Sequence, residues 1–164
     1  LKKRVNYKNL DSIIGLITKN IFGKKMNYES EFFIDQSLKI PEQKVEGDNV
    51  LHTDRFIPNV KIIFSPFSIN KNGSPFSYVL RSHKITNKYV DEIANGFHKD
   101  HEYLFKQYSK KIVKLDVNEN SLIVALTNGY HARAPFEEIG QRSLLFFQFM
   151  NSYNKFFIFK YFFK

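Results

Sequence analysis

The chain has 164 residues, a formal net charge of +9 and no cysteine, and 43% of its residues are hydrophobic, including 18 phenylalanines. This length and composition predict one globular domain over 1–164 and argue against wholesale disorder. The absence of cysteine excludes a disulfide scaffold, thiolate metal sites and cysteine nucleophiles. Because the chain begins with Leu1 and not with methionine, we expect a chain that is processed, trimmed or truncated at its N-terminus.

The hydrophobic runs are too short to cross a membrane, because a spanning helix needs about 20 apolar residues. The basic start at Lys2, Lys3 and Arg4 continues into polar residues and not into a signal-peptide core. We therefore expect a cytoplasmic protein without a membrane partner. The lysine excess accompanies much asparagine and isoleucine, as an A/T-rich coding sequence produces, so it predicts no nucleic-acid partner by itself. A basic nucleic-acid binder is a further hypothesis that requires basic and aromatic side chains on one exposed sheet face.

The first predicted element is an amphipathic helix over 9–22, where apolar residues recur at helical spacing and Gly23 is placed to end the helix. Between Thr86 and Lys111 the pattern is helical again, which predicts an insertion between strands. The aromatic end over 154–164 is either a last strand or a segment exposed by truncation. Seven short runs rich in β-branched and aromatic residues predict the strands of a sandwich or barrel: FFID (32–35), VLHTDRFI (50–57), VKIIFSPFSI (60–69), PFSYVL (75–80), IVKLDV (112–117), SLIVALTNGYHA (121–132) and RSLLFFQFM (142–150).

Three residues carry the chemistry of the sequence. Motifs of a nucleophile elbow, a P-loop or a dinucleotide-binding loop are absent. His52 and Asp54 lie two apart in a predicted strand and therefore project to the same face, while His131 lies near the end of a later predicted strand. Two imidazoles and one carboxylate on one face of a metal leave three coordination positions open, an arrangement suited to non-heme Fe(II) and oxygen chemistry.

Two blocks of sequence in the same order resemble the phytanoyl-CoA dioxygenase family of Fe(II)/2-oxoglutarate oxygenases. The first is LHTDRFIPNVKIIFSPFSINKNGSPFSYVLRSHK, with H-x-D, a strand, an Asn-Gly turn followed by Pro and an aromatic residue, and Ser-His-Lys. The second is NSLIVALTNGYHARAPFEEIGQRSLLFFQF, with a histidine at a strand end and an arginine eleven residues later. The resemblance covers about 31–155, the expected oxygenase core. It implies a mainly β (α+β) fold, a double-stranded β-helix or jelly roll with flanking helices and a helical insertion.

The resemblance also implies the roles of individual residues. His52, Asp54 and His131 are expected to bind Fe(II) and thereby to be the catalytic residues. Arg142 is expected to point inward and to bind the far carboxylate of the cosubstrate 2-oxoglutarate, because a guanidinium offers two parallel donors. Arg133 either contacts the cosubstrate or substrate, or lies where the strand is already ending. With O2 as second cosubstrate, the expected reaction is hydroxylation of a small or acyl substrate, since the retained Asp54 argues against halogenation.

The other histidines and a stretch of basic residues are expected to lie outside the metal site. His83 is expected to make loop hydrogen bonds, and His98 and His101 to lie on a solvated helix face. The stretch from Arg55 to Lys88 contains six basic residues and no acidic one, so it is expected to border the cavity and to favour an anionic substrate. The six are Arg55, Lys61, Lys71, Arg81, Lys84 and Lys88.

The sequence departs from the resembled family in two places. It lacks most of the usual N-terminal helical region, and Leu80-Arg81 replaces a Pro-Gly pair before the Ser-His. The first departure leaves an alternative open: a catalytically inactive jelly-roll binding protein, or an incomplete fragment of such an enzyme. Decarboxylation of the keto acid with added iron distinguishes the two. The sequence names neither the substrate nor the oligomeric state.

Overall fold

The computed structural model describes residues 7–28, 30–38, 47–54, 59–84, 101–135 and 140–150. Strand pairing within these ranges is antiparallel, and the fold is mainly β with two α-helices. The elements are α1 (Tyr7–Phe22), β1 (Ser30–Leu38), the 3-10 helix η1 (Gly47–Asn49), β2 (Asn59–Ser65), β3 (Phe76–Val79), α3 (His101–Tyr108), the 3-10 helix η2 (Ser109–Lys111), β4 (Ile112–Lys114), β5 (Ser121–Leu126), β6 (His131–Arg133) and β7 (Gly140–Met150).

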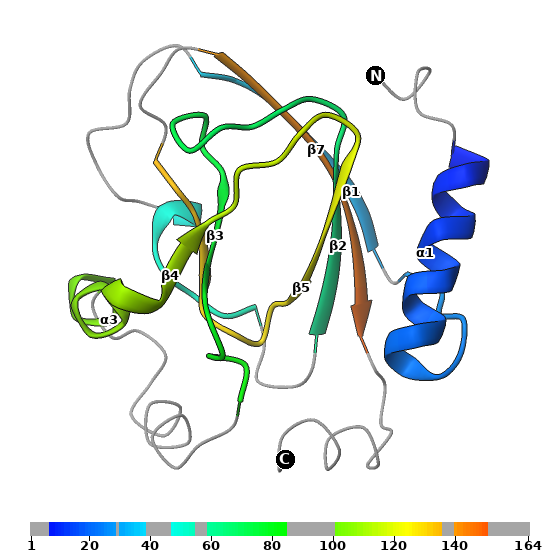
Figure 1. Cartoon of the computed structure of the whole chain (residues 1–164), viewed down its shortest axis with the longest axis horizontal. Coiled ribbons are helices and arrows are strands. Elements are labelled where there is room, and N and C mark those ends of the chain that lie inside the picture. The colour runs from blue at the N-terminus through cyan, green and yellow to red at the C-terminus, as the bar shows by residue number, and fades with distance from the viewer. Residues whose placement is uncertain are drawn as a thin grey trace.

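The strands form two sheets. The large sheet has the order β1-β7-β2-β5, and the small sheet has the order β4-β3-β6. Helix α1 lies along the outer side of the large sheet, and α3 lies at the far side of the small sheet (Figure 1). Leu104 of α3 is buried with Val79 and Ala132 of the small sheet. The layers therefore run α1, large sheet, small sheet, α3.

Helix α1 packs on the large sheet through one apolar face. Its residues Leu10 and Ile14 recur at helical spacing and are 5% and 3% exposed. After the helix, Gly23 has φ +74°, a left-handed conformation that glycine adopts without strain and that ends many helices. The two helix residues share a buried cluster with Val60, Ile62, Leu145, Phe147 and Phe149 of the large sheet. Burial of apolar surface stabilises a fold by about 25 cal/mol per Å², and this burial holds the helix to the sheet.

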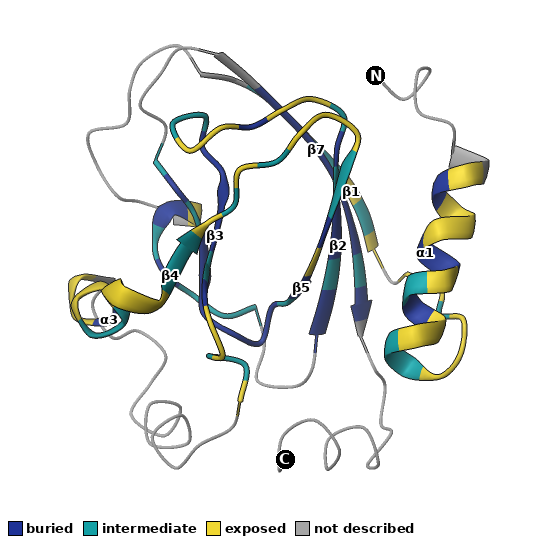
Figure 2. Ribbon diagram, in the orientation of Figure 1, coloured by how far each residue is buried: buried dark blue, intermediate teal, exposed yellow. Residues whose placement is uncertain are grey.

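Alternate residues of β7 face opposite sides of the large sheet, as the pleat of a strand requires. Leu145 and Phe147 belong to the cluster under α1, whereas Leu144 and Phe146 belong to a second buried cluster between the two sheets. Figure 2 shows that β2 and β7 are buried along much of their length. Arg142 is in phase with Leu144 and Phe146, so the strand directs its side chain into the space between the sheets.

Most of the predicted elements are confirmed. The helix predicted over 9–22 is α1, and five predicted strands lie at β1, β2, β3, β4 and β7. The strand predicted over 50–57 is wrong for 51–54, where only His52 forms a β-bridge. The run over 121–132 is two strands, because a turn closed by Gly129 N donating to Leu126 O (3.0 Å) separates β5 from β6.

Two predicted segments fall partly or wholly outside the described residues. Of the insertion predicted between Thr86 and Lys111, the structure describes α3, η2 and the region from 101 onward, and 85–100 lie outside. The aromatic end over 154–164 also lies outside. None of the described helices combines the length and the apolar character that a membrane span requires.

Two neighbouring isoleucines of α1 test the packing of this helix. Ile14 is 3% exposed and Ile13 is 44% exposed. We expect Ile14→Ala to lower the free energy of unfolding by about 2–5 kcal/mol, because it leaves a cavity under the helix. The matched change Ile13→Ala should alter it by about 0.5 kcal/mol or less. Urea unfolding followed by circular dichroism measures both; equal losses would contradict the packing described.

Candidate metal centre

The two histidines of the candidate site are held side by side by their own backbones. His52 N donates to His131 O and His131 N donates to His52 O, both at 2.9 Å. This pair of hydrogen bonds attaches the segment before Asp54 to the edge of β6 as an antiparallel bridge. The imidazole centroids are 4.5 Å apart. The bridge therefore brings together two side chains that are 79 positions apart in the sequence.

Both imidazoles use the same ring nitrogen to contact the backbone. The Nδ1 of His52 lies 2.7 Å from Val50 O, and the Nδ1 of His131 lies 2.9 Å from Gly129 O. A carbonyl oxygen only accepts hydrogen bonds, so each Nδ1 carries the proton and donates it. In the neutral ring this tautomer leaves the lone pair on Nε2, the nitrogen that binds a metal.

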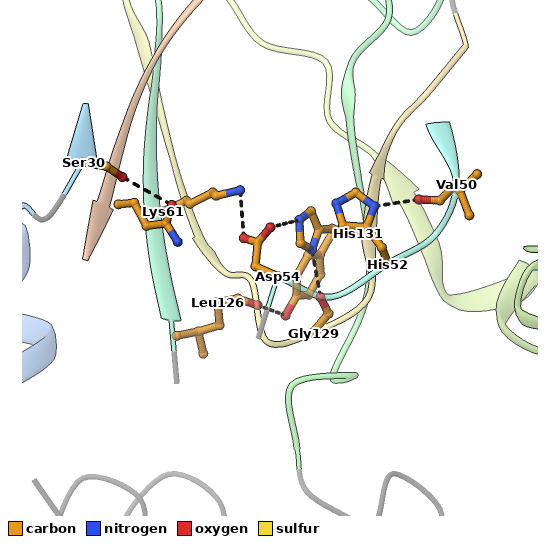
Figure 3. Close-up of polar contacts among 10 residues, drawn as sticks. Ser30, Val50, His52, Asp54, Lys61, Leu126, Gly129 and His131 are labelled. Carbon is orange, nitrogen blue, oxygen red and sulfur yellow. Dashed lines mark hydrogen bonds and ion pairs between the residues drawn. The ribbon is translucent and has the colours of Figure 1, made fainter. Parts of the chain in front are cut away.

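Asp54 completes the group. Its backbone N donates to Thr127 O at 2.9 Å, which fixes this residue beside the turn that follows β5. Its Oδ1 lies 3.6 Å from His131 Nε2, and its Oδ2 lies 2.8 Å from Lys61 Nζ (Figure 3). One ligand atom from each of His52, Asp54 and His131 lies within 4.8 Å of the others. The described residues contain no other such group of three.

Burial and neighbouring groups shift the pKa values of His52 and Asp54. Burial lowers the pKa of His52, and the neighbouring His131 lowers it further. Burial alone would raise the pKa of Asp54, but contacts with His131 and Lys61 outweigh it and bring this pKa well below its ordinary value. At neutral pH, His52 is therefore neutral and the carboxylate is ionised.

A cavity of about 170 Å³ opens beside the three residues. Arg142, only 4% exposed, and the half-buried Arg133 both line this cavity. Arg133 Nη1 donates to Ser74 Oγ at 2.8 Å, so its guanidinium is anchored at the cavity wall. The remaining lining residues are the three candidate ligands, Lys61, Asp48, Ala132, Phe32, Ile34, Phe76 and Phe146. The cavity thus combines the candidate ligands with positive charge and apolar walls.

A larger cavity shares Ala132 and Arg133 with this one. It has a volume of about 570 Å³ and is lined mainly by α3, β4 and β6, with Leu51, Phe105 and Ile112 among its apolar residues. None of the three candidate ligands lines it. We place the functional site at the smaller cavity, because only there do ligand groups of suitable chemistry converge.

The basic stretch reaches the smaller cavity at a single described position. Lys61 lines it, whereas Lys71, Arg81 and Lys84 are exposed and do not. Arg55 and Lys88 lie outside the described residues. The expected contribution of this stretch to the cavity is therefore limited, among the described residues, to Lys61.

Among the described side chains, that of His83 does not join the three candidate ligands. His83 Nδ1 lies 3.4 Å from Tyr78 Oη, and His83 O accepts a hydrogen bond from Asn128 Nδ2 at 3.0 Å, as expected for a residue with a role in a loop. Burial and the nearby Lys84 lower the pKa of His83. His101 is the first residue of α3, and His98 lies outside the described residues.

His131 is positioned by two residues that the sequence analysis did not single out, Ser82 and Gly129. Ser82 Oγ accepts a hydrogen bond from Tyr130 N at 2.7 Å, and the carbonyl of Gly129 holds the imidazole. A Cβ at Gly129 would collide with the Tyr78 hydroxyl and lie 2.8 Å from Ser82 Oγ, so this position requires glycine. The Asn-Gly pair just before His131 was the available signal. Arg81, which stands where the resembled family has glycine, has φ +64°.

The comparisons with known proteins give a likeness in structure. No protein-family model matches the chain, and no curated protein sequence matches it. Among solved structures, HygX from Streptomyces hygroscopicus with nickel and 2-oxoglutarate bound is similar with a TM-score of 0.51 and 13% identity, over 74% of this chain and 55% of HygX. HygX with iron bound is similar with a TM-score of 0.48 and 17% identity, over 72% of this chain and 55% of HygX. This chain thus spans about half the length of HygX, and at this identity the likeness concerns the fold.

Removal of single histidines tests the assignment of the ligands. We expect His131→Ala to weaken Co²⁺ binding by more than the about 10- to 100-fold that loss of an outer partner costs, because it removes a direct ligand. His83→Ala, the matched control, should leave the affinity unchanged. Calorimetric titration of the full chain measures both. Equal effects, or a larger effect of His83→Ala, would show that the ligands are assigned wrongly.

Proposed function

We propose that the protein is an Fe(II)- and 2-oxoglutarate-dependent dioxygenase that hydroxylates a small or acyl substrate. The observation that carries this proposal is the convergence of His52, Asp54 and His131 within 4.8 Å at a cavity that also contains the buried Arg142. The structural likeness to HygX, which has been crystallised with iron and with 2-oxoglutarate, supports it. The resemblance to phytanoyl-CoA dioxygenases stays a prediction.

The donor atoms of the site fit a divalent iron ion. Each Nδ1 donates to a carbonyl, so each ring in its neutral form offers the lone pair of Nε2 to a metal, and Asp54 supplies an ionised oxygen. Two imidazoles and one carboxylate on one face of a metal are the ligand set of non-heme Fe(II) oxygenases. Bound there, iron and 2-oxoglutarate would supply the oxidising power for hydroxylation of an unactivated carbon. His52, Asp54 and His131 would hold the metal.

Arg142 is the residue best placed to bind the cosubstrate. It is 4% exposed and lines the cavity, and its guanidinium offers a planar pair of donors to a carboxylate. In our proposal it binds the far carboxylate of 2-oxoglutarate, while the keto acid end lies toward the candidate ligands. Arg133, already held by Ser74, lines the same cavity and contributes positive charge there.

The proposed fold is a jelly roll. Two antiparallel sheets face each other with the candidate ligands and Arg142 between them, the arrangement in which jelly-roll proteins hold their sites. The apolar side chains of Phe76 and Phe146 wall the cavity. In a cavity of this kind the protein's contribution is to position the substrate carbon and to exclude water.

The proposal is tested by succinate release. The full chain, supplied with Fe(II), ascorbate and 2-oxoglutarate, should release succinate slowly even before a substrate is found, and more rapidly in a screen of small and acyl candidates. Asp54→Ala should release none, because it removes one of three protein ligands. A wild-type chain that binds iron and 2-oxoglutarate without succinate release is instead an inactive binding protein.

Variants of Arg142 test the cosubstrate site separately from turnover. We expect Arg142→Ala to lose about 2–5 kcal/mol of 2-oxoglutarate binding, the cost of removing one partner of a buried charge pair. Arg142→Lys should lose less, because it retains the charge without the two-point geometry. The charge-transfer absorption of the anaerobic iron protein gives both affinities. The control is Arg81→Ala, which changes an exposed arginine. If Arg142→Ala leaves the affinity for 2-oxoglutarate unchanged, Arg142 does not bind its far carboxylate, and Arg133 is the next candidate.

A further inference from the structure

Lys61 is a charged residue directed into the interior of the fold. It lies on β2 two residues before Ile63, which belongs to the cluster between the sheets, so the two side chains share a face. Its register neighbours are Ala125 on β5 and Gln148 on β7. The small side chain of Ala125 leaves room beside it. The lysine stem can therefore extend between the sheets to the candidate metal centre.

The ammonium of Lys61 meets one particular oxygen of Asp54. Lys61 Nζ lies 2.8 Å from Oδ2, and the two side chains are 14% and 17% exposed. Solvent and salt screen such a pair weakly. The other oxygen, Oδ1, lies 3.6 Å from His131 Nε2 (Figure 3). The two oxygens of one carboxylate thus face different partners, the lysine and the candidate metal position.

This division matters because a carboxylate can bind a metal through one oxygen or through both. With one oxygen, the two histidines and Asp54 occupy three positions of a six-coordinate ion and leave three open. With both oxygens, only two positions would stay open. A chelating keto acid and O2 together need three.

We propose that Lys61 is a positioning residue of the metal centre: its ammonium holds Oδ2 of Asp54, so that Oδ1 alone is offered to the metal. This inference rests on the proposed function. Lys61 also places a positive charge beside the metal position, and this charge weakens metal binding. The same contact keeps one more coordination position open. A lysine that served only to stabilise the fold would not affect the coordination number of the metal.

Mn²⁺ bound to the full chain tests the proposal, because water relaxation counts the exchangeable waters on this ion. We expect about three waters on wild type and about two on Lys61→Met, where Oδ2 is released to the metal. Lys61→Met should bind Mn²⁺ at least about tenfold more tightly, since a nearby positive charge is gone. With 2-oxoglutarate bound to the Mn²⁺ protein, about one exchangeable water should remain on wild type and about none on Lys61→Met, since the chelating keto acid takes two positions.

Three variants complete the experiment. Lys61→Arg retains the charge and should keep the wild-type water count, whereas Lys71→Met removes an exposed lysine from the turn after β2 and should change nothing. Lys61→Leu replaces Lys61→Met if circular dichroism shows that the latter is unfolded. If the neutral variants keep three waters and wild-type affinities, the inference is wrong and the proposed function stands. If wild type itself binds no Mn²⁺, the proposed function fails with it.

Discussion

The candidate centre depends on one backbone interaction, the pair of hydrogen bonds between His52 and His131. These bonds, both 2.9 Å long, attach the segment 51–54 to the edge of β6 and fix the separation of the two imidazoles. Asp54 follows two residues later and is tied to Thr127 by its own backbone. Because no metal is needed to make these bonds, the protein alone preorganises the ligand atoms. Preorganisation lowers the cost of binding an ion there.

The two sheets supply the charged residues around this centre through the pleat of their strands. On β7 the residues that alternate with the α1 cluster point between the sheets, and Arg142 is one of them. On β2 the same alternation directs Lys61 toward Asp54. Helix α1 covers the other side of the large sheet, so the apolar residues of β2 and β7 are buried on both faces. A one-residue slip of either strand would turn the cation that it carries away from the site.

Most helices and strands, and the residue types of the candidate site, could be predicted from the sequence. The contacts between the residues of the site could not. Helical and strand periodicity located α1 and most strands, because burial on one face imposes the pattern directly. The spacing of His52 and Asp54 indicated a common face, although the segment is a bridge and a bend and not a regular strand. The ion pair with Lys61 and the collision that excludes a side chain at Gly129 arise between distant segments, so local pattern did not reveal them.

The most direct test of the account is the position of iron in an anaerobic crystal of the full chain, located by its anomalous scattering. We predict one iron peak within about 2.0–2.2 Å of His52 Nε2, His131 Nε2 and an oxygen of Asp54. Iron bound at His83 or at another surface group, with these three residues unliganded, would contradict the account.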